Sequence, residues 1–184
     1  RLTGPEASEF GQLWLEWGSE RVINIVERMV SLCETQPDVE FEVIYKQGLN
    51  HPNSAVRVAS LKGLEESEDR ALVIPLSKIL KSDPAPEVRR AAAIPLAHLS
   101  MMAETGKLSM AYRETLENTL YGVLEDEQEI QDVKLKVMEA VSVFAAERLT
   151  SHIELAWASG DLKARQSSLF AMGQTSDPRW IEYV

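Results

Sequence analysis

Apolar side chains recur every three to four residues along almost the whole chain of 184 residues, a spacing that predicts amphipathic helices. Alternating runs bounded by Asn-Gly or Asp-Gly turns are nearly absent, so strands are not expected. Caps and breakers divide the pattern into about ten helices, with boundaries at Gly18-Ser19, Gln36-Pro37-Asp38 (opening a helix that ends near Gly48), Ser54 as a cap, Pro86, Asp161 and Pro178. One longer link is expected around Ala103–Ser109. The chain is therefore predicted to be all-α.

Four basic residues mark an internal repeat: Arg57, Arg89, Lys134 and Arg165. They are 32, 45 and 31 positions apart, and the longest separation contains the polar link, so the repeat is about 32 residues, or two helices. Small or aliphatic residues recur one position before each basic residue (Val56, Val88, Val133, Ala164) and three (Ser60, Ala92, Val137, Ser168), six (Gly63, Pro95, Ala140, Ala171) and seven positions after it (Leu64, Leu96, Val141, Met172).

These positions lie on one side of a helix, and the small residues among them allow neighbouring helices to approach closely. A two-helix unit cannot bury such a face alone, whereas stacked units can, so the repeat predicts an α-solenoid. We expect four hairpins and the start of a fifth in residues 37–184. Residues 1–36 are expected to form capping helices, with a stripe of Phe10, Leu13, Trp14 and Trp17 that covers the open end or, alternatively, anchors a partner.

The repeats resemble the HEAT-repeat family. The second copy carries the fullest pattern, with Pro75, Asp83-Pro84, Val88-Arg89, Ala92 and Leu96, and Arg165–Gly173 is similar to the second helix of bacterial HEAT-like arrays, including phycobilin-lyase-type repeats. The other copies lack the proline (Val43, Leu120, Ser151) and the turn aspartate (His51, Gln128, Ser159). The resemblance covers residues 40–184. It implies a right-handed α–α superhelix, open-ended at the C-terminus, that acts as a scaffold for protein–protein contacts.

The residues offer little chemistry. Cys33 is the single cysteine and lies on an apolar stripe, which excludes an internal disulfide and a thiolate zinc site. His51, His98 and His152 fall in different repeats, so no metal site is expected, and neither a phosphate-binding loop nor a nucleophile elbow occurs. No apolar run could span a membrane. We expect a cytoplasmic protein that is not an enzyme and binds no cofactor, metal or membrane.

Charge narrows the partners further. The net charge of −10 argues against binding to a nucleic-acid backbone, as in HEAT-like DNA glycosylases, and Glu65 and Glu139 would add negative charge to the concave face. Two acidic runs, residues 65–69 and 125–129, are expected to be solvated turns, with docking of a basic partner as the alternative.

The second helices carry the main functional hypothesis. The basic column of Arg57, Arg89, Lys134 and Arg165 is expected to stabilise each hairpin through a turn acid such as Asp83 or through helix-end carbonyls. Positions one, five and eight after the basic residue face away from the core, on the concave face of such solenoids. The candidate groove for a protein or peptide is Val58, Lys62, Arg90, Ile94, Leu135, Glu139, Gln166 and Phe170, with Glu65, Ala97, Ser142 and Gly173 at the eighth position. Alternatively, its apolar members pack between repeats.

Two other functions stay open from the sequence. One is a phycobilin-lyase-type chromophore-attachment factor, implied by the repeat resemblance alone, and the other is a structural spacer between domains. The chain opens at Arg1 without a methionine and closes in an apolar stretch, residues 180–184, which predicts a segment of a longer protein. A continuation would cover Trp180 and Tyr183, so their outer faces are expected to be exposed or packed against a neighbour.

Overall fold

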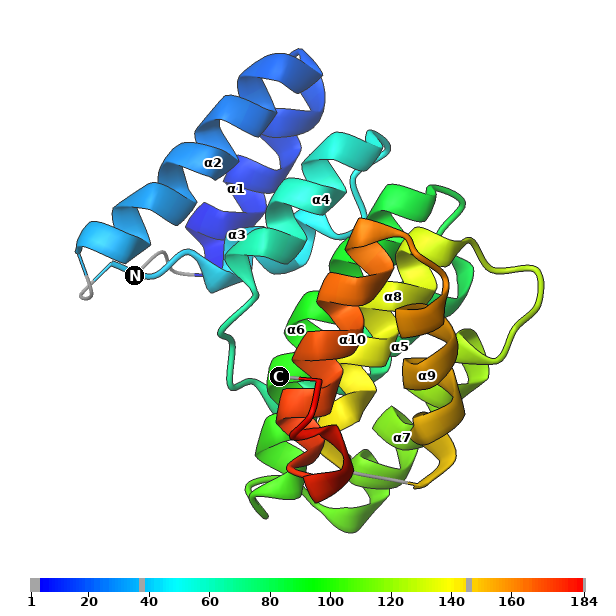
Figure 1. Cartoon of the computed structure of the whole chain (residues 1–184). Helices are drawn as coiled ribbons and strands as arrows, with labels where there is room; N and C mark the ends of the chain where they lie inside the picture. Colours follow the sequence, from blue (N-terminus) through cyan, green and yellow to red (C-terminus); the bar gives the residue numbers. More distant parts are fainter. Residues whose placement is uncertain (1–3, 37–38, 145–146, 184) are drawn as a thin grey trace. The chain divides into compact units, whose positions relative to one another are not determined.

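The structure is a computed structural model that describes residues 4–36, 39–144 and 147–183. Within these residues the regular elements are all helical, with ten α-helices and no strand, which confirms the all-α prediction (Figure 1). No helix in the described ranges is long and apolar enough to cross a bilayer. The chain divides into two compact units, Arg1–Ser67 and Glu68–Val184, called unit 1 and unit 2 below.

Unit 1 contains four helices: α1 (Gly4–Glu16), α2 (Ser19–Thr35), α3 (Glu42–Gly48) and α4 (Ser54–Gly63). α1 packs against α3, α2 packs against α4, and α3 and α4 form a hairpin. The sequence predicts a change from capping helices to repeats between residues 36 and 37, and this stays a prediction.

The N-terminal aromatic stripe is only partly buried. Trp14 lies in the core of unit 1, and the ring of Phe10 contacts the rings of Trp14 and Trp17, with centroids 5.4 and 5.7 Å away. Leu13 is exposed, so the N-terminal aromatic stripe is wider than the part of it that packs on the rest of unit 1.

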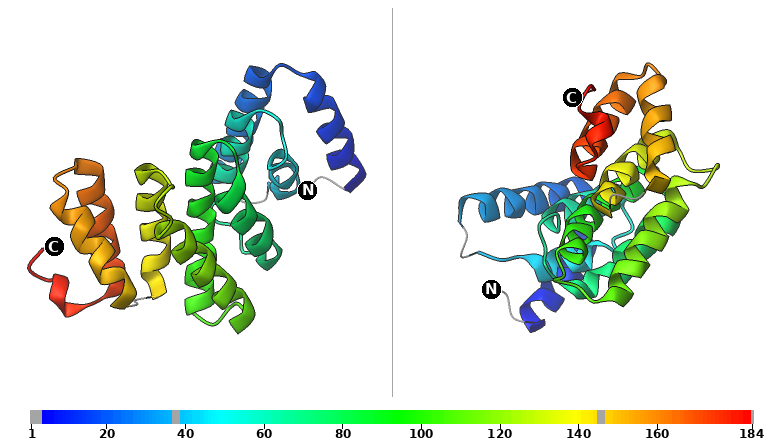
Figure 2. Two further views of the ribbon diagram at one scale, coloured as in Figure 1. Left: turned by 90° about the vertical axis from the view of Figure 1, so that its right-hand side faces the viewer. Right: turned by 60° about the horizontal axis from the view of Figure 1, so that its bottom comes forward.

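Unit 2 contains three hairpins: α5 (Val73–Ser82) with α6 (Pro86–Glu104), α7 (Met110–Leu124) with α8 (Gln131–Val141), and α9 (Thr150–Ala158) with α10 (Leu162–Thr175). Short 3-10 turns lie at Arg70–Leu72, Ser142–Phe144, Glu147–Leu149 and Pro178–Trp180. The second helices pack on one another in chain order, with α8 between α6 and α10 (Figure 2). Among the first helices, α5 packs on α7.

Capping side chains begin several of these helices. The Asn53 carboxamide accepts a hydrogen bond from the backbone N–H of Ala55 at 2.9 Å, so the cap of α4 is Asn53 and the prediction of Ser54 is wrong by one residue. Asp161 caps α10 through the N–H of Ala164, as expected. Of the predicted helix opening at Gln36-Pro37-Asp38, the second and third residues lie outside the described ranges; α3 itself begins at Glu42 and ends at Gly48.

The inner face predicted from the repeat is buried in all four copies. The residues one position before the basic residue, and those three and seven positions after it, are all buried. At the sixth position, Pro95, Ala140 and Ala171 are also buried, while Gly63 is half-buried. The sequence pattern therefore identifies the packing surface of every second helix.

The residues near the C-terminus differ from one another. Trp180 is buried within unit 2, whereas Tyr183 is exposed, with ring centroids 5.7 Å apart. The expectation of an exposed outer face is thus confirmed for Tyr183 and wrong for Trp180, which the chain itself covers.

The close approach at the sixth repeat position can be tested with two glycines. A Cβ added at Gly63 would lie 2.7 Å from the ring of the buried Tyr45, whereas a Cβ at Gly122, inside α7, meets nothing within 4 Å. We expect Gly63→Ala to lower the free energy of unfolding by at least about 1 kcal/mol. Gly122→Ala should raise it by about 0.5–1 kcal/mol, because alanine restricts the unfolded chain and favours the helix. Urea denaturation followed by circular dichroism measures both, and equal effects would show that Gly63 has room for a side chain.

Candidate functional site

Three of the four residues in the basic column donate hydrogen bonds to the ends of the first helices or the turns that follow them, whereas the Lys134 side chain forms no hydrogen bond or ion pair with the residues that the structure describes. Arg57 and Arg89 each donate from Nη1 to the carbonyl oxygen six residues earlier, at His51 and Asp83, and both distances are 2.8 Å. The Nε of Arg165 donates to the carbonyl of Trp157 at 3.4 Å. These guanidinium groups meet carbonyls that end a helix or line the turn after it, where the helix dipole favours a cation.

Arg89 also joins two repeats through a bidentate ion pair. Its Nε and Nη2 donate to the two carboxylate oxygens of Glu129 at 2.7 and 2.8 Å, and Glu129 accepts the backbone N–H of Ile130 as well. The Glu129 side chain is only 7% exposed. The hydrogen bonds from Arg89 therefore lower the pKa of Glu129 below its ordinary value.

Other carboxylates of the acidic runs are paired within the chain. Glu125 forms an ion pair with Arg148, and Glu68 contacts Lys107 at 3.1 Å. Together with Glu129, these contacts neutralise part of both runs, so the runs offer less free negative charge than their sequences suggest.

The candidate groove residues fall in both units. Val58 is half-buried and Lys62 is exposed, and both belong to unit 1. The other six lie on α6, α8 and α10 of unit 2, and four of them line one hollow of about 210 Å3: Arg90, Leu135, Glu139 and Gln166. The sequence thus identifies residues that the fold of unit 2 brings together.

This hollow, called the unit 2 hollow, is more polar than predicted. Its other lining residues are Asp132, Lys136, Lys163 and Ser167, none of which was selected from the sequence. Lys136 and the Ser167 hydroxyl both donate to Glu139, each at 2.5 Å, and Lys163 lies 3.3 Å from Asp132. Arg90 forms no hydrogen bond or ion pair with any residue that the structure describes, and its exposed guanidinium is available to an anion.

The residues that were predicted to face outward from the second helices separate into two groups. Leu135 is 5% exposed and Ser142 is fully buried, so their predicted outward position is wrong. The reason is that α8 lies between α6 and α10, the second helices of the neighbouring hairpins. These side chains therefore pack between repeats, as the alternative interpretation expected. Phe170 is 50% exposed and Ile94 is partly exposed, so both can contact a partner.

His51 and Cys33 are accounted for by local packing. His51 is buried, its Nδ1 accepts the N–H of Asn53 at 3.1 Å, and its ring lies against Trp14. Cys33 is half-buried with its Sγ 3.7 Å from the hydroxyl of Tyr45. In the part of the chain that the structure describes, no three His, Cys, Asp or Glu side chains are placed to hold a metal ion.

The comparisons with known proteins give no match: no family model, no curated protein and no solved structure is significantly similar to the chain. Its function is therefore argued from its own residues.

The pairing of Arg89 with Glu129 predicts a pH-dependent stability. Glu129→Gln should lower the free energy of unfolding by about 2 kcal/mol near neutral pH, because the half-buried Arg89 guanidinium loses a charged acceptor. Since the folded-state pKa lies below the ordinary value of 4.5, the stabilisation is present above pH 4.5 and is lost as the pH falls through the folded-state pKa. The difference between wild type and variant should shrink accordingly in urea titrations from pH 7 to about pH 3. Glu125→Gln, in the more exposed pair with Arg148, is the matched control and should change stability much less.

Proposed function

We propose that the chain is a non-enzymatic HEAT-like scaffold that binds a segment of another protein across the second helices of unit 2. The unit 2 hollow carries this proposal. It contains a cation without a partner among the described residues, Arg90. The exposed ring of Phe170 lies outside the hollow, one turn along α10 from Gln166, which lines it. A carboxylate on the partner suits Arg90, and an apolar side chain suits Phe170 and Ile94.

The repeat supports the scaffold class. The same positions are buried in all four copies, and the second helices of unit 2 pack in chain order, which is the arrangement that a stacked array requires. The right-handed superhelix and the cytoplasmic location remain parts of the proposal.

Size favours a protein segment over a chromophore at this site. The unit 2 hollow has about 210 Å3, below the roughly 300–1,000 Å3 of pockets that enclose small molecules. A side chain or two from a partner fits such a hollow while the rest of the partner lies across the surface. If the chain is only a spacer between domains, it binds no partner, so the binding experiment described next also tests this alternative.

The test compares two double variants of equal charge. Ile94→Asp with Phe170→Asp should weaken retention of bound proteins from a lysate at least tenfold, because both apolar contacts of the face acquire charge. The melting temperature should fall by only a few degrees, because both side chains are at least partly exposed. Ile74→Asp with Leu155→Asp changes two exposed apolar residues on first helices and should leave retention unchanged.

Three measurements are made on each variant. Quantitative mass spectrometry identifies the retained proteins, biolayer interferometry gives the Kd of the most abundant retained protein, and thermal unfolding gives the melting temperature. A partner bound equally by both double variants would place its site elsewhere. A large loss of thermal stability in the first variant would show that Ile94 and Phe170 belong to the core. No retained protein would favour the spacer.

A further inference from the structure

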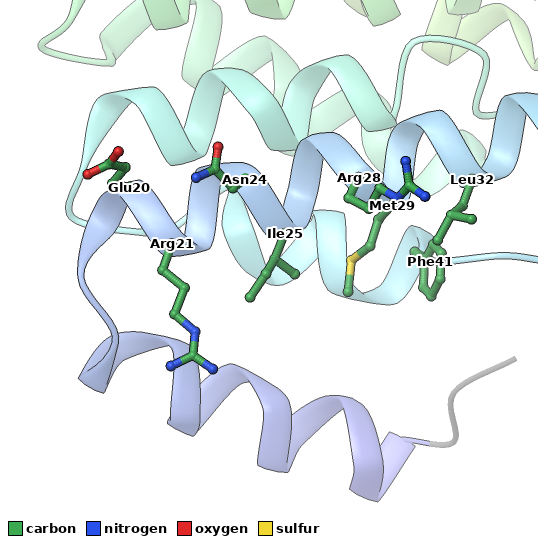
Figure 3. A pocket seen from close by; sticks show the side chains of 8 residues that line it. All are labelled: Glu20, Arg21, Asn24, Ile25, Arg28, Met29, Leu32 and Phe41. Atoms are coloured by element: carbon green, nitrogen blue, oxygen red, sulfur yellow. The ribbon is translucent and has the colours of Figure 1, made fainter.

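One side of α2 in unit 1 is an open apolar surface, here called the α2 groove (Figure 3). It is lined by Glu20, Arg21, Asn24, Ile25, Arg28, Met29, Leu32 and Phe41, and its volume is about 760 Å3. Ile25, Met29, Leu32 and Phe41 are each partly exposed there. The groove shares no residue with the unit 2 hollow, so binding at the α2 groove does not depend on the proposed function.

The groove exists because the first two helices pack on different partners. α2 buries Val22 and Val26 completely and packs on α4, whereas α1 packs on α3. In Figure 3, Arg21, Ile25 and Met29 extend from α2 into the space between α2 and α1. The apolar stripe of α2 is therefore wider than the surface that covers it, and its edge at Ile25, Met29 and Leu32 is partly exposed.

The spacing of the groove residues fits a helix as the occupant. Arg21, Ile25, Arg28 and Leu32 follow one another at intervals of four, three and four residues, which places them on one face over about 17 Å. A second helix packs along such a face by interdigitating its side chains. An extended peptide would bring unpaired N–H groups to a wall whose side-chain acceptors are Asn24 and Glu20, whereas a helix satisfies its backbone internally.

The rim of the groove is positive in a chain of net charge −10. Arg21 and Arg28 contribute two guanidinium groups against the single carboxylate of Glu20. The Arg21 guanidinium lies over the Trp17 ring, 4.5 Å from its centroid, and Arg28 forms no hydrogen bond or ion pair within the described ranges. Carboxylates on an incoming helix complement this rim.

A second copy of the chain is a poorer occupant. The same face of its α2 would bring two more arginines and one glutamate (Arg21, Arg28 and Glu20) to a rim that is already positive, and each copy carries a net charge of −10. We propose that the α2 groove binds an amphipathic α-helix of a partner protein, with the apolar face of that helix on Ile25 and Met29 and its acidic residues beside Arg21 and Arg28.

The experiment selects helices on the full 184-residue chain. The probe is a displayed library of single helices of about 18 residues, long enough to cover the groove, with apolar residues at i, i+4, i+7 and i+11 and with Glu, Lys or Gln at the flanking positions. We expect selected helices to carry Glu at least about tenfold more often than Lys at the flanks. Selection on Arg28→Glu should reverse this preference, and Met29→Asp should bind the selected helices at least about tenfold more weakly.

Arg70→Glu is the matched control, because it makes the same charge change at an exposed arginine of unit 2 and should keep the wild-type preference. Circular dichroism verifies that every variant is folded. The proposal is overturned if selection yields no helix that distinguishes wild type from Arg28→Glu, or if Glu and Lys are selected equally. Sedimentation velocity measures the oligomeric state of the wild type and of Arg28→Glu. If the wild type is a dimer and Arg28→Glu is a monomer, the groove binds a second copy of the chain and the proposal is wrong.

Discussion

The packing of each second helix against its neighbours is the constraint on which the rest of the structure depends. A hairpin of two short helices has one apolar stripe that it cannot bury within itself, so the stripe must meet another hairpin. Within the hairpin of α3 and α4 the two helices also approach closely: a Cβ at Gly48 would lie 1.9 Å from the Ser60 hydroxyl, and one at Gly63 would overlap the ring of Tyr45. Small residues at fixed positions therefore set the distance between helices, and all other features occupy the surfaces that remain.

The arginines Arg57, Arg89 and Arg165 satisfy a second requirement, because a tightly packed turn leaves carbonyl groups without helical partners. Arg57 and Arg89 donate to equivalent carbonyls at equal distances although their turns differ in sequence. Arg89 then has donors left for Glu129, which lies in the turn of the next repeat. One side chain thus stabilises its own hairpin and fixes the hairpin after it.

The repeat positions explain how much could be predicted from sequence. Periodicity and alignment identified the helices, the buried face and four of the residues that line the unit 2 hollow, because these depend on local pattern. The burial of Leu135 and Ser142 depends on having a helix on each side of α8, which a single-helix projection does not contain. The hydrogen bond from Arg89 to Glu129 joins residues that are 40 positions apart. The α2 groove arises because α1 packs on α3 whereas α2 packs on α4. Spacing along one helix does not predict which helices pack together. The intervals of four, three and four residues along α2 do indicate that Arg21, Ile25, Arg28 and Leu32 share one face of that helix.

Variation within the repeat separates architecture from recognition. The positions that pack inside every repeat hold the same kind of residue in all four copies, because the helix separation permits little else. The fifth position after the basic residue holds Lys62, Ile94, Glu139 and Phe170, which differ in charge, size and polarity. Where this position is exposed, as at Lys62 and Phe170, it can vary without loss of fold, so its chemistry is available for contact with other molecules. Phe170 illustrates the point, since half of a large apolar side chain is exposed to water where the fold would accept a charged one.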